Sequence, residues 1–130
     1  MSAAAAAFYA SFRDVPAGAW RWPNFAPAEI ASKGDGSLKV VPAALDALER
    51  ARALAGRPLA ILSAYRDPLH NARVGGAPLS RHKAGDAFDI ALAGADKEAL
   101  AAALKGAGFT GFGLGYRTFV HADLGPHRSW

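Results

Sequence analysis

Two histidine–aspartate pairs in this chain could bind a metal ion. His82 and Asp89 lie seven residues apart in the segment Ser80–Asp89. His121 and Asp123 lie in an otherwise apolar run further along the chain. Polar and charged groups inside apolar strands cost free energy to bury unless they are paired or coordinate a metal. A mononuclear zinc site is therefore our working hypothesis.

The residue types restrict the ligands that such a site can have. The chain has no cysteine, so any metal must be held by histidine and carboxylate. A catalytic zinc ion needs three protein ligands and one open position for water. His82, Asp89 and His121 would supply two imidazoles and one carboxylate, provided that the strand with His121 lies beside the strand with Asp89.

Each of these residues also has an ordinary structural interpretation. A single histidine on a strand is commonly a hydrogen-bonded core residue, and Asp89 could be the buried partner of an arginine. Asp123 lies two residues after His121 and shares its strand face. It could orient that histidine, cap a local structure or act as the catalytic carboxylate. The metal hypothesis therefore depends on the residues taken together.

Hydrophobic periodicity and turn residues indicate the elements that must position these side chains. Leucine and alanine at helical spacing predict a helix over residues 42–55 that ends at Gly56. We predict shorter helices over 27–32, 68–73 and 96–105, and strands over 59–65, 87–92 and 119–124. The residues before Asp89 are predicted to form a loop that leads into its strand. Turns too short for repeated parallel crossovers favour an α+β fold, a small antiparallel sheet with flanking helices.

Composition indicates one globular domain. With 130 residues, 52% hydrophobic and 20% charged, the chain can bury a single core. We expect residues 1–25, rich in aromatic residues and proline, to form an arm packed on a single domain over 26–130. Trp20 and Trp22 in this arm could line a groove or belong to the core.

Charge and hydropathy exclude several kinds of partner. The net charge of +4 comes from basic residues that are scattered rather than interleaved with aromatics, so we expect no nucleic-acid partner. No apolar run reaches the 18 residues typical of a membrane span, so we expect no membrane partner. The first residues lack the basic and apolar regions of a signal peptide. We expect a monomer.

Several segments of the chain, taken in order, resemble the motifs of a known family. They are Ser63–Arg66, His70–Asn71, Val74–Ala77, Ser80–Asp89 and Phe119–Pro126. The family is that of the zinc D-alanyl-D-alanine carboxypeptidases and murein endopeptidases, which share their fold with the hedgehog signalling domain. The likeness covers roughly residues 25–130. The pattern Ser-x-His-x-x-Gly-x-Ala-x-Asp, followed by His-x-Asp and by Arg128-Ser129-Trp130, is specific and resembles the His-x-Asp subgroup.

This resemblance implies functional roles for individual residues. His82, Asp89 and His121 resemble the family's zinc ligands, with one Zn²⁺ per chain. Arg66 resembles the arginine that anchors the substrate or polarises its carbonyl, and a guanidinium suits either task because it can form paired hydrogen bonds. The alternative for Arg66 is a structural salt bridge.

The remaining site residues follow from the resemblance less directly. Ser80 and Tyr65 are candidates for substrate binding, although Ser80 could equally order its loop. Many family members carry an Asp or Glu as general base about three residues before the third ligand, where this chain has Thr118. Asp123 is therefore our candidate for the base, and the alternative is that it only orients His121.

The family resemblance implies a zinc peptidase domain over residues 26–130 that hydrolyses peptidoglycan stem or cross-link peptides. It would act as a carboxypeptidase or endopeptidase through metal-activated water. The first alternative is a non-catalytic zinc domain that binds cell-wall peptides or a protein partner, and the second is a metal-free structural domain. Without a signal peptide, we expect synthesis in the cytoplasm and delivery to the cell wall by a phage-like particle or a holin, or secretion by another route. A cytoplasmic recycling carboxypeptidase would have the same sequence.

Overall fold

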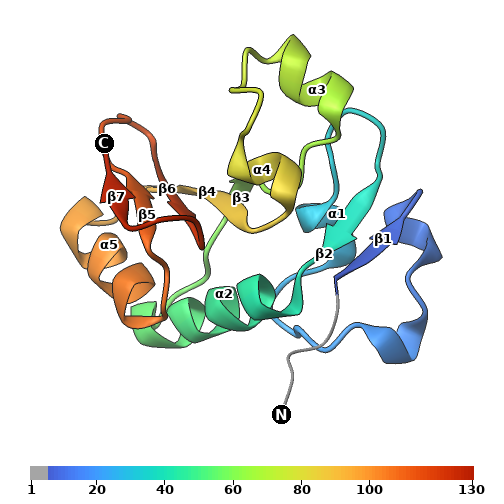
Figure 1. The fold of residues 1–130 in the computed structure, drawn as a ribbon. Helices are drawn as coiled ribbons and strands as arrows, with labels where there is room; N and C mark the ends of the chain where they lie inside the picture. The colour runs from blue at the N-terminus through green and yellow to red at the C-terminus, as the bar shows by residue number, and fades with distance from the viewer. Residues whose placement is uncertain (1–5) are drawn as a thin grey trace.

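The computed structural model describes residues 6–130 and contains two sheets (Figure 1). The larger sheet has the strand order β3-β4-β6-β5-β7, and the smaller one pairs β1 with β2. The strands are β1 (Ala7–Tyr9), β2 (Leu38–Val40), β3 (Ile61–Ser63), β4 (Ala87–Ala91), β5 (Gly111–Gly113), β6 (Phe119–Asp123) and β7 (Arg128–Ser129). All pairs are antiparallel except β5 with β7. The predicted α+β class is confirmed.

The helices lie on both sides of the larger sheet. They are α1 (Pro27–Ile30), α2 (Pro42–Ala55), α3 (Pro68–Arg73), α4 (Arg81–Ala84) and α5 (Lys97–Gly106), with 3₁₀ turns η1 (Phe12–Asp14) and η2 (Ala17–Ala19). Figure 1 shows α2 and α5 near each other on one side of the sheet, and α3 and α4 toward the other side. Proline at the first position begins α1, α2 and α3, where its missing N–H costs no hydrogen bond.

Alternation along the central strands separates the core from the polar face. On β4, Phe88 and Ile90 are fully buried in the hydrophobic core, while Asp89 between them points to the opposite face. The same core cluster contains Leu45 and Leu48 of α2, Leu100 and Leu104 of α5, and Val120 and Ala122 of β6. One face of the sheet is thus used for packing, and the other is free to carry the polar side chains.

The segment Ser80–Asp89 differs from the predicted loop because it contains a helical turn, α4. The Ser80 hydroxyl accepts a hydrogen bond from the backbone N–H of His82 at 3.2 Å and so caps this turn. Gly85 ends the turn with a left-handed φ of 85°, a conformation that other residues rarely adopt. The turn fixes the direction in which His82 points.

The N-terminal segment packs on the domain as far as it is described, and residues 1–5 of the predicted arm lie outside the described residues. Trp22 and Phe25 belong to the hydrophobic core. The indole N–H of Trp22 donates to Asp46 Oδ1 at 2.8 Å, which satisfies its polar atom. Of the two roles considered for Trp22, the structure therefore supports the core role and not the lining of a groove. Among residues 6–130, no helix is long and apolar enough to cross a membrane.

Candidate metal centre

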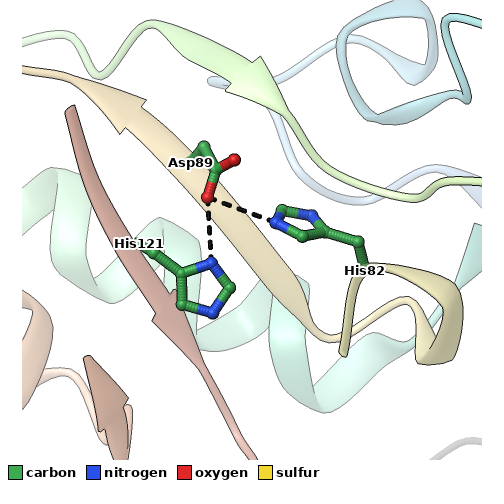
Figure 2. Close-up of side chains that lie close together, drawn as sticks. All are labelled: His82, Asp89 and His121. Atoms are coloured by element: carbon green, nitrogen blue, oxygen red, sulfur yellow. Dashed lines mark hydrogen bonds and ion pairs between the residues drawn. The ribbon is translucent and has the colours of Figure 1, made fainter. Parts of the chain in front are cut away.

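His82, Asp89 and His121 meet at one point on the polar face of the sheet (Figure 2). One potential ligand atom from each lies within 4.8 Å of the other two, and all three residues are buried. Asp89 Oδ1 is 3.2 Å from His82 Nε2 and 2.9 Å from His121 Nδ1. The sequence-predicted ligands therefore form a compact two-histidine, one-carboxylate cluster.

Strand register brings Asp89 and His121 together. The two residues are direct cross-strand partners on β4 and β6, and the row continues to Ser63 on β3 and Gly113 on β5. Partners in such a row project from the same face of a sheet at close distance. Strand register therefore fixes the positions of Asp89 and His121 relative to each other without a contribution from a loop.

His82 reaches the same point from α4 because two hydrogen bonds hold it to the chain that follows β3. Its ring Nδ1 lies 2.7 Å from the carbonyl oxygen of Ala64. Its backbone carbonyl accepts from the N–H of Arg66 at 3.1 Å. The short helical turn is thereby fixed against the edge of the sheet, and the Nε2 side of the ring faces Asp89.

The partners of the two imidazoles test whether the cluster suits a cation. The Ala64 carbonyl can only accept a hydrogen bond, so Nδ1 of His82 carries the proton and Nε2 presents a lone pair to Asp89. Nε2 of His121 lies 2.7 Å from Asp123 Oδ2, so this nitrogen is protonated and Nδ1 presents its lone pair to Asp89. In their neutral forms the two imidazoles and the carboxylate thus aim lone pairs at one another, an arrangement that needs either a bound cation or protons on these ring nitrogens. The residues fit a metal ion.

The electrostatics of the cluster keep the carboxylate ionised. When no cation is bound, protonated imidazoles can donate to Asp89. Burial by itself raises the pKa of Asp89, but these hydrogen bonds from His121 and His82 outweigh it and hold the pKa well below the usual range. Burial lowers the pKa of His121, and its hydrogen bonds with Asp123 and Asp89 raise that pKa above the usual value. An ionised Asp89 is what a metal ligand must be.

Asp123 lies in the neighbouring cross-strand row and is held by several donors. It is fully buried, and its carboxylate accepts from Arg128 Nη1 at 2.9 Å, from Arg128 Nη2 at 2.8 Å and from the N–H of Gly125 at 2.8 Å, besides His121. Burial raises its pKa, but these hydrogen bonds, led by that of His121, lower it well below the usual range. A Cβ on Gly111 would lie 2.1 Å from Asp123 Oδ1, so the pair with Arg128 needs glycine there. This geometry favours Asp123 as the group that orients His121 over Asp123 as the proton acceptor.

Arg66 lies beside the cluster. Its Nη2 is 3.5 Å from Asp89 Oδ2, the carboxylate oxygen that does not face the histidines. Its Nε donates to Ser63 Oγ at 3.2 Å and its Nη1 to Asn71 Oδ1 at 3.4 Å. The side chain keeps 17% of its surface exposed, so the guanidinium is both held in place and accessible.

An open cleft of about 870 Å³ gives access to the cluster. The predicted site residues that line it are Arg66, Ser80, His82, Asp89, His121 and Asp123. Tyr65 lies outside the set of described residues that line the cleft. It is buried and its ring packs edge-on against Phe8, with centroids 6.4 Å apart. The structure thus does not bring Tyr65 to the cleft, because its ring packs against Phe8 of β1 instead.

Two residues that line the cleft, Arg128 and Trp130, and one buried residue that contacts its lining, Asn71, had no role assigned from the sequence. Arg128 holds Asp123, and Asn71 contacts Arg66. The ring of Trp130 lies beside the ring of His121, with centroids 5.1 Å apart. Arg128 and Trp130 belong to the motif Arg128-Ser129-Trp130 that follows His-x-Asp. This motif was the sequence feature from which their roles could have been predicted. Asn71 lies in the pair His70–Asn71, where nothing in the sequence alone distinguishes a buried amide from an exposed one.

Comparison with known proteins identifies the family. The family model for peptidase M15 matches residues 23–123. The chain belongs to the peptidase M15 family. This M15 match includes the three clustered residues and Arg66, and it extends to Asp123. M15 proteins are zinc metallopeptidases of the D-Ala-D-Ala carboxypeptidase type, which agrees with a metal-binding cluster in an open cleft. A search of curated proteins found no match to the chain.

Proposed function

We propose that this M15 chain is a zinc peptidase that hydrolyses peptidoglycan stem or cross-link peptides. The observation that carries the proposal is the convergence of three potential ligand atoms, His82 Nε2, Asp89 Oδ1 and His121 Nδ1, at an open cleft. Two imidazoles and one carboxylate are a ligand set typical of catalytic zinc. A bound zinc ion would supply a water with a pKa of about 7 and would polarise the scissile carbonyl.

The protein groups around the cluster would position the substrate. The Arg66 guanidinium faces the cleft and could form paired hydrogen bonds with a peptide carboxylate or with the oxyanion of the hydrolytic transition state. Removing one oxyanion donor commonly raises the barrier by about 3 kcal/mol. Arg81 and Arg128 also line the cleft. These two arginines are paired with Asp86 and Asp123. Arg66 has a longer contact of 3.5 Å to Asp89, so it is the guanidinium that supports a peptide substrate with free carboxylates, as stem peptides have.

The second candidate function, a non-catalytic zinc domain that binds wall peptides, is favoured by one observation. Among the described residues that line the cleft, the carboxylates are Asp89, a proposed ligand, and Asp123, whose oxygens are held by Arg128 and His121. Thr118 occupies the position where many relatives carry the base. A hydrolytic reaction would then need Asp123 to release a donor, or a proton acceptor other than these two carboxylates.

Digestion of purified sacculi, followed by mass spectrometry of the released muropeptides, separates these functions. We expect the zinc-loaded wild type to release peptides and His82→Ala to release none and to lose the metal. His127→Ala is the matched control, because His127 is an exposed histidine that lines a different groove. Release by His82→Ala equal to that of the wild type would refute the zinc peptidase. A wild type that holds one zinc per chain and binds sacculi without cleaving them would favour the binding domain.

A further inference from the structure

Asn71 is a buried amide that contacts two residues of the cleft lining, Arg66 and Ala77. It lies on α3 with only 2% of its surface exposed. Its Oδ1 accepts from Arg66 Nη1 at 3.4 Å, and its Nδ2 donates to the carbonyl oxygen of Ala77 at 2.9 Å. Its backbone carbonyl also accepts from the N–H of Gly76 at 2.8 Å. One residue thus joins Arg66 to the loop between α3 and α4.

The partners of the amide fix its orientation and explain the residue type. A guanidinium only donates and a carbonyl oxygen only accepts, so the oxygen of Asn71 must face Arg66 and its nitrogen must face Ala77. A carboxylate would place an acceptor against the Ala77 carbonyl, and an aliphatic side chain would satisfy neither partner. Buried polar groups that lose a partner are costly. Asparagine has the geometry for both contacts.

The loop that Asn71 holds continues to the metal cluster. The Ala77 carbonyl accepts a second hydrogen bond from the N–H of Ser80 at 3.0 Å. Ser80 caps the helical turn that carries His82. Gly76 packs directly on the amide, because a Cβ there would lie 2.1 Å from Asn71 Oδ1 and 3.1 Å from Arg66 Nη1. Contacts therefore run without a break from Arg66 through Asn71 and the loop to the first ligand.

The same loop borders the mouth of the cleft. Val74 and Leu79 line the cleft and are 54% and 92% exposed. Large apolar side chains this exposed beside a site are available for contact with a ligand. The position of these side chains relative to Arg66 depends on the hydrogen bonds that Asn71 makes to the loop.

We propose that Asn71 is a positioning residue for the peptidase reaction. It fixes the position of the Arg66 guanidinium relative to the loop over residues 74–79, so that both can contact the substrate. The inference rests on the proposed function for its consequence in hydrolysis, but the link between Asn71 and Arg66 is testable without a substrate. Asn71 contacts no reacting atom and acts through Arg66. Its removal lowers turnover because a guanidinium displaced by about 1 Å no longer meets the developing charge.

Nuclear magnetic resonance of the zinc-loaded, ¹⁵N-labelled chain tests the link directly. We expect the Nε–H signal of Arg66 to shift or broaden in Asn71→Ala and in Gly76→Ala, which disturbs the same contact from the loop side. Leu69→Ala, an exposed change on the same helix, is the control and should leave the signal unchanged. An Arg66 signal in Asn71→Ala that matches the wild type in position and width would overturn the inference.

A double-mutant cycle on peptide hydrolysis tests the consequence. We expect Asn71→Ala to lower kcat/KM about tenfold in the wild-type background and less than about twofold in the Arg66→Ala background, with one zinc per chain throughout. Equal losses in both backgrounds would contradict an action through Arg66. If the wild type hydrolyses no peptide, the proposed function fails and the resonance experiment still decides the role of Asn71.

Discussion

Asp123→Asn distinguishes a carboxylate that orients His121 from one that accepts a proton. The carboxylate accepts from four donor groups, including both terminal nitrogens of Arg128. A carboxamide has one oxygen acceptor, so its NH₂ must face one nitrogen of Arg128 in either orientation, together with either the N–H of Gly125 or the imidazole of His121. The substitution keeps the size of the side chain and removes its charge, so it disturbs hydrogen bonding and electrostatics without leaving a cavity.

The expected magnitudes follow from burial. Removing one partner of a fully buried ion pair costs about 3–5 kcal/mol. The side chain of Arg128 is 37% exposed, so water screens part of the loss and about 2 kcal/mol is the better expectation. In a domain of this size that lowers Tm by about 6–10 °C. Loss of the negatively charged partner of His121 should weaken zinc binding about 10–100-fold, the usual effect of removing the partner of a metal-bound histidine.

The assay measures peptide hydrolysis as a function of free zinc in a metal buffer, at a temperature well below either Tm. If Asp123 orients His121, Asp123→Asn needs about 10–100-fold more free zinc for half-maximal activity and recovers most of its activity at saturation. Asp14→Asn, which removes an exposed carboxylate from η1, should behave like the wild type.

The opposite result would refute our reasoning about Asp123. A general base contributes about 10²–10⁴-fold to a rate, so its loss cannot be restored by metal. An Asp123→Asn protein that binds zinc as tightly as the wild type but stays inactive at saturating zinc would therefore make Asp123 the base. In that case Arg128 would have to release the carboxylate during the reaction.

Two further substitutions test the packing and the capping of the site. Gly111→Ala should lower Tm by about 5 °C or more, because its Cβ would overlap Asp123, whereas Gly18→Ala has open space and should not; equal Tm values would contradict the packing. Burial raises the pKa of Asp67, but the hydrogen bond from Ser32 and the other donors lower it below the usual value. The ionised Asp67 therefore stabilises the fold above about pH 4, and this stabilisation is lost as the pH falls through the folded-state pKa. Urea unfolding should therefore show Asp67→Asn about 1 kcal/mol less stable at pH 7, with a gap that narrows near pH 3; a widening gap would be inconsistent with this pKa.

The sequence allowed prediction of those elements that have a clear period or a clear boundary. The helix over 42–55 has the predicted bounds, because proline begins it, leucine and alanine recur at helical spacing and Gly56 ends it. The strands that carry Asp89 and His121 were predicted to within one residue at each end, since apolar residues surround each of them. The structure brings these two residues together through register, which the sequence permitted but did not specify.

The parts that the sequence did not reveal depend on contacts between distant residues. The turn α4 has four residues, which are too few for a helical period to be recognised in the sequence. Strand β7 has two residues and forms only because β5 lies beside it. Tyr65 and Arg66 are neighbours in one motif, yet Tyr65 is buried while Arg66 lines the cleft. The role of Asp123 is undetermined until the position of Arg128 is known.

Metal binding and substrate binding rest on different parts of the fold. Asp89 and His121 lie on paired central strands whose other face forms the core, so their geometry is as rigid as the sheet. Arg66 lies on the irregular segment after β3. Among residues 6–130, its guanidinium is held by hydrogen bonds to the side chains of Ser63 and Asn71 and by a contact with the Asp89 carboxylate. Changes in the loop over 74–79 can therefore alter substrate preference while the ligands stay in place. His82 is the exception, because the Ser80 cap joins its helical turn to that same loop, so large changes there should weaken zinc binding through this one ligand.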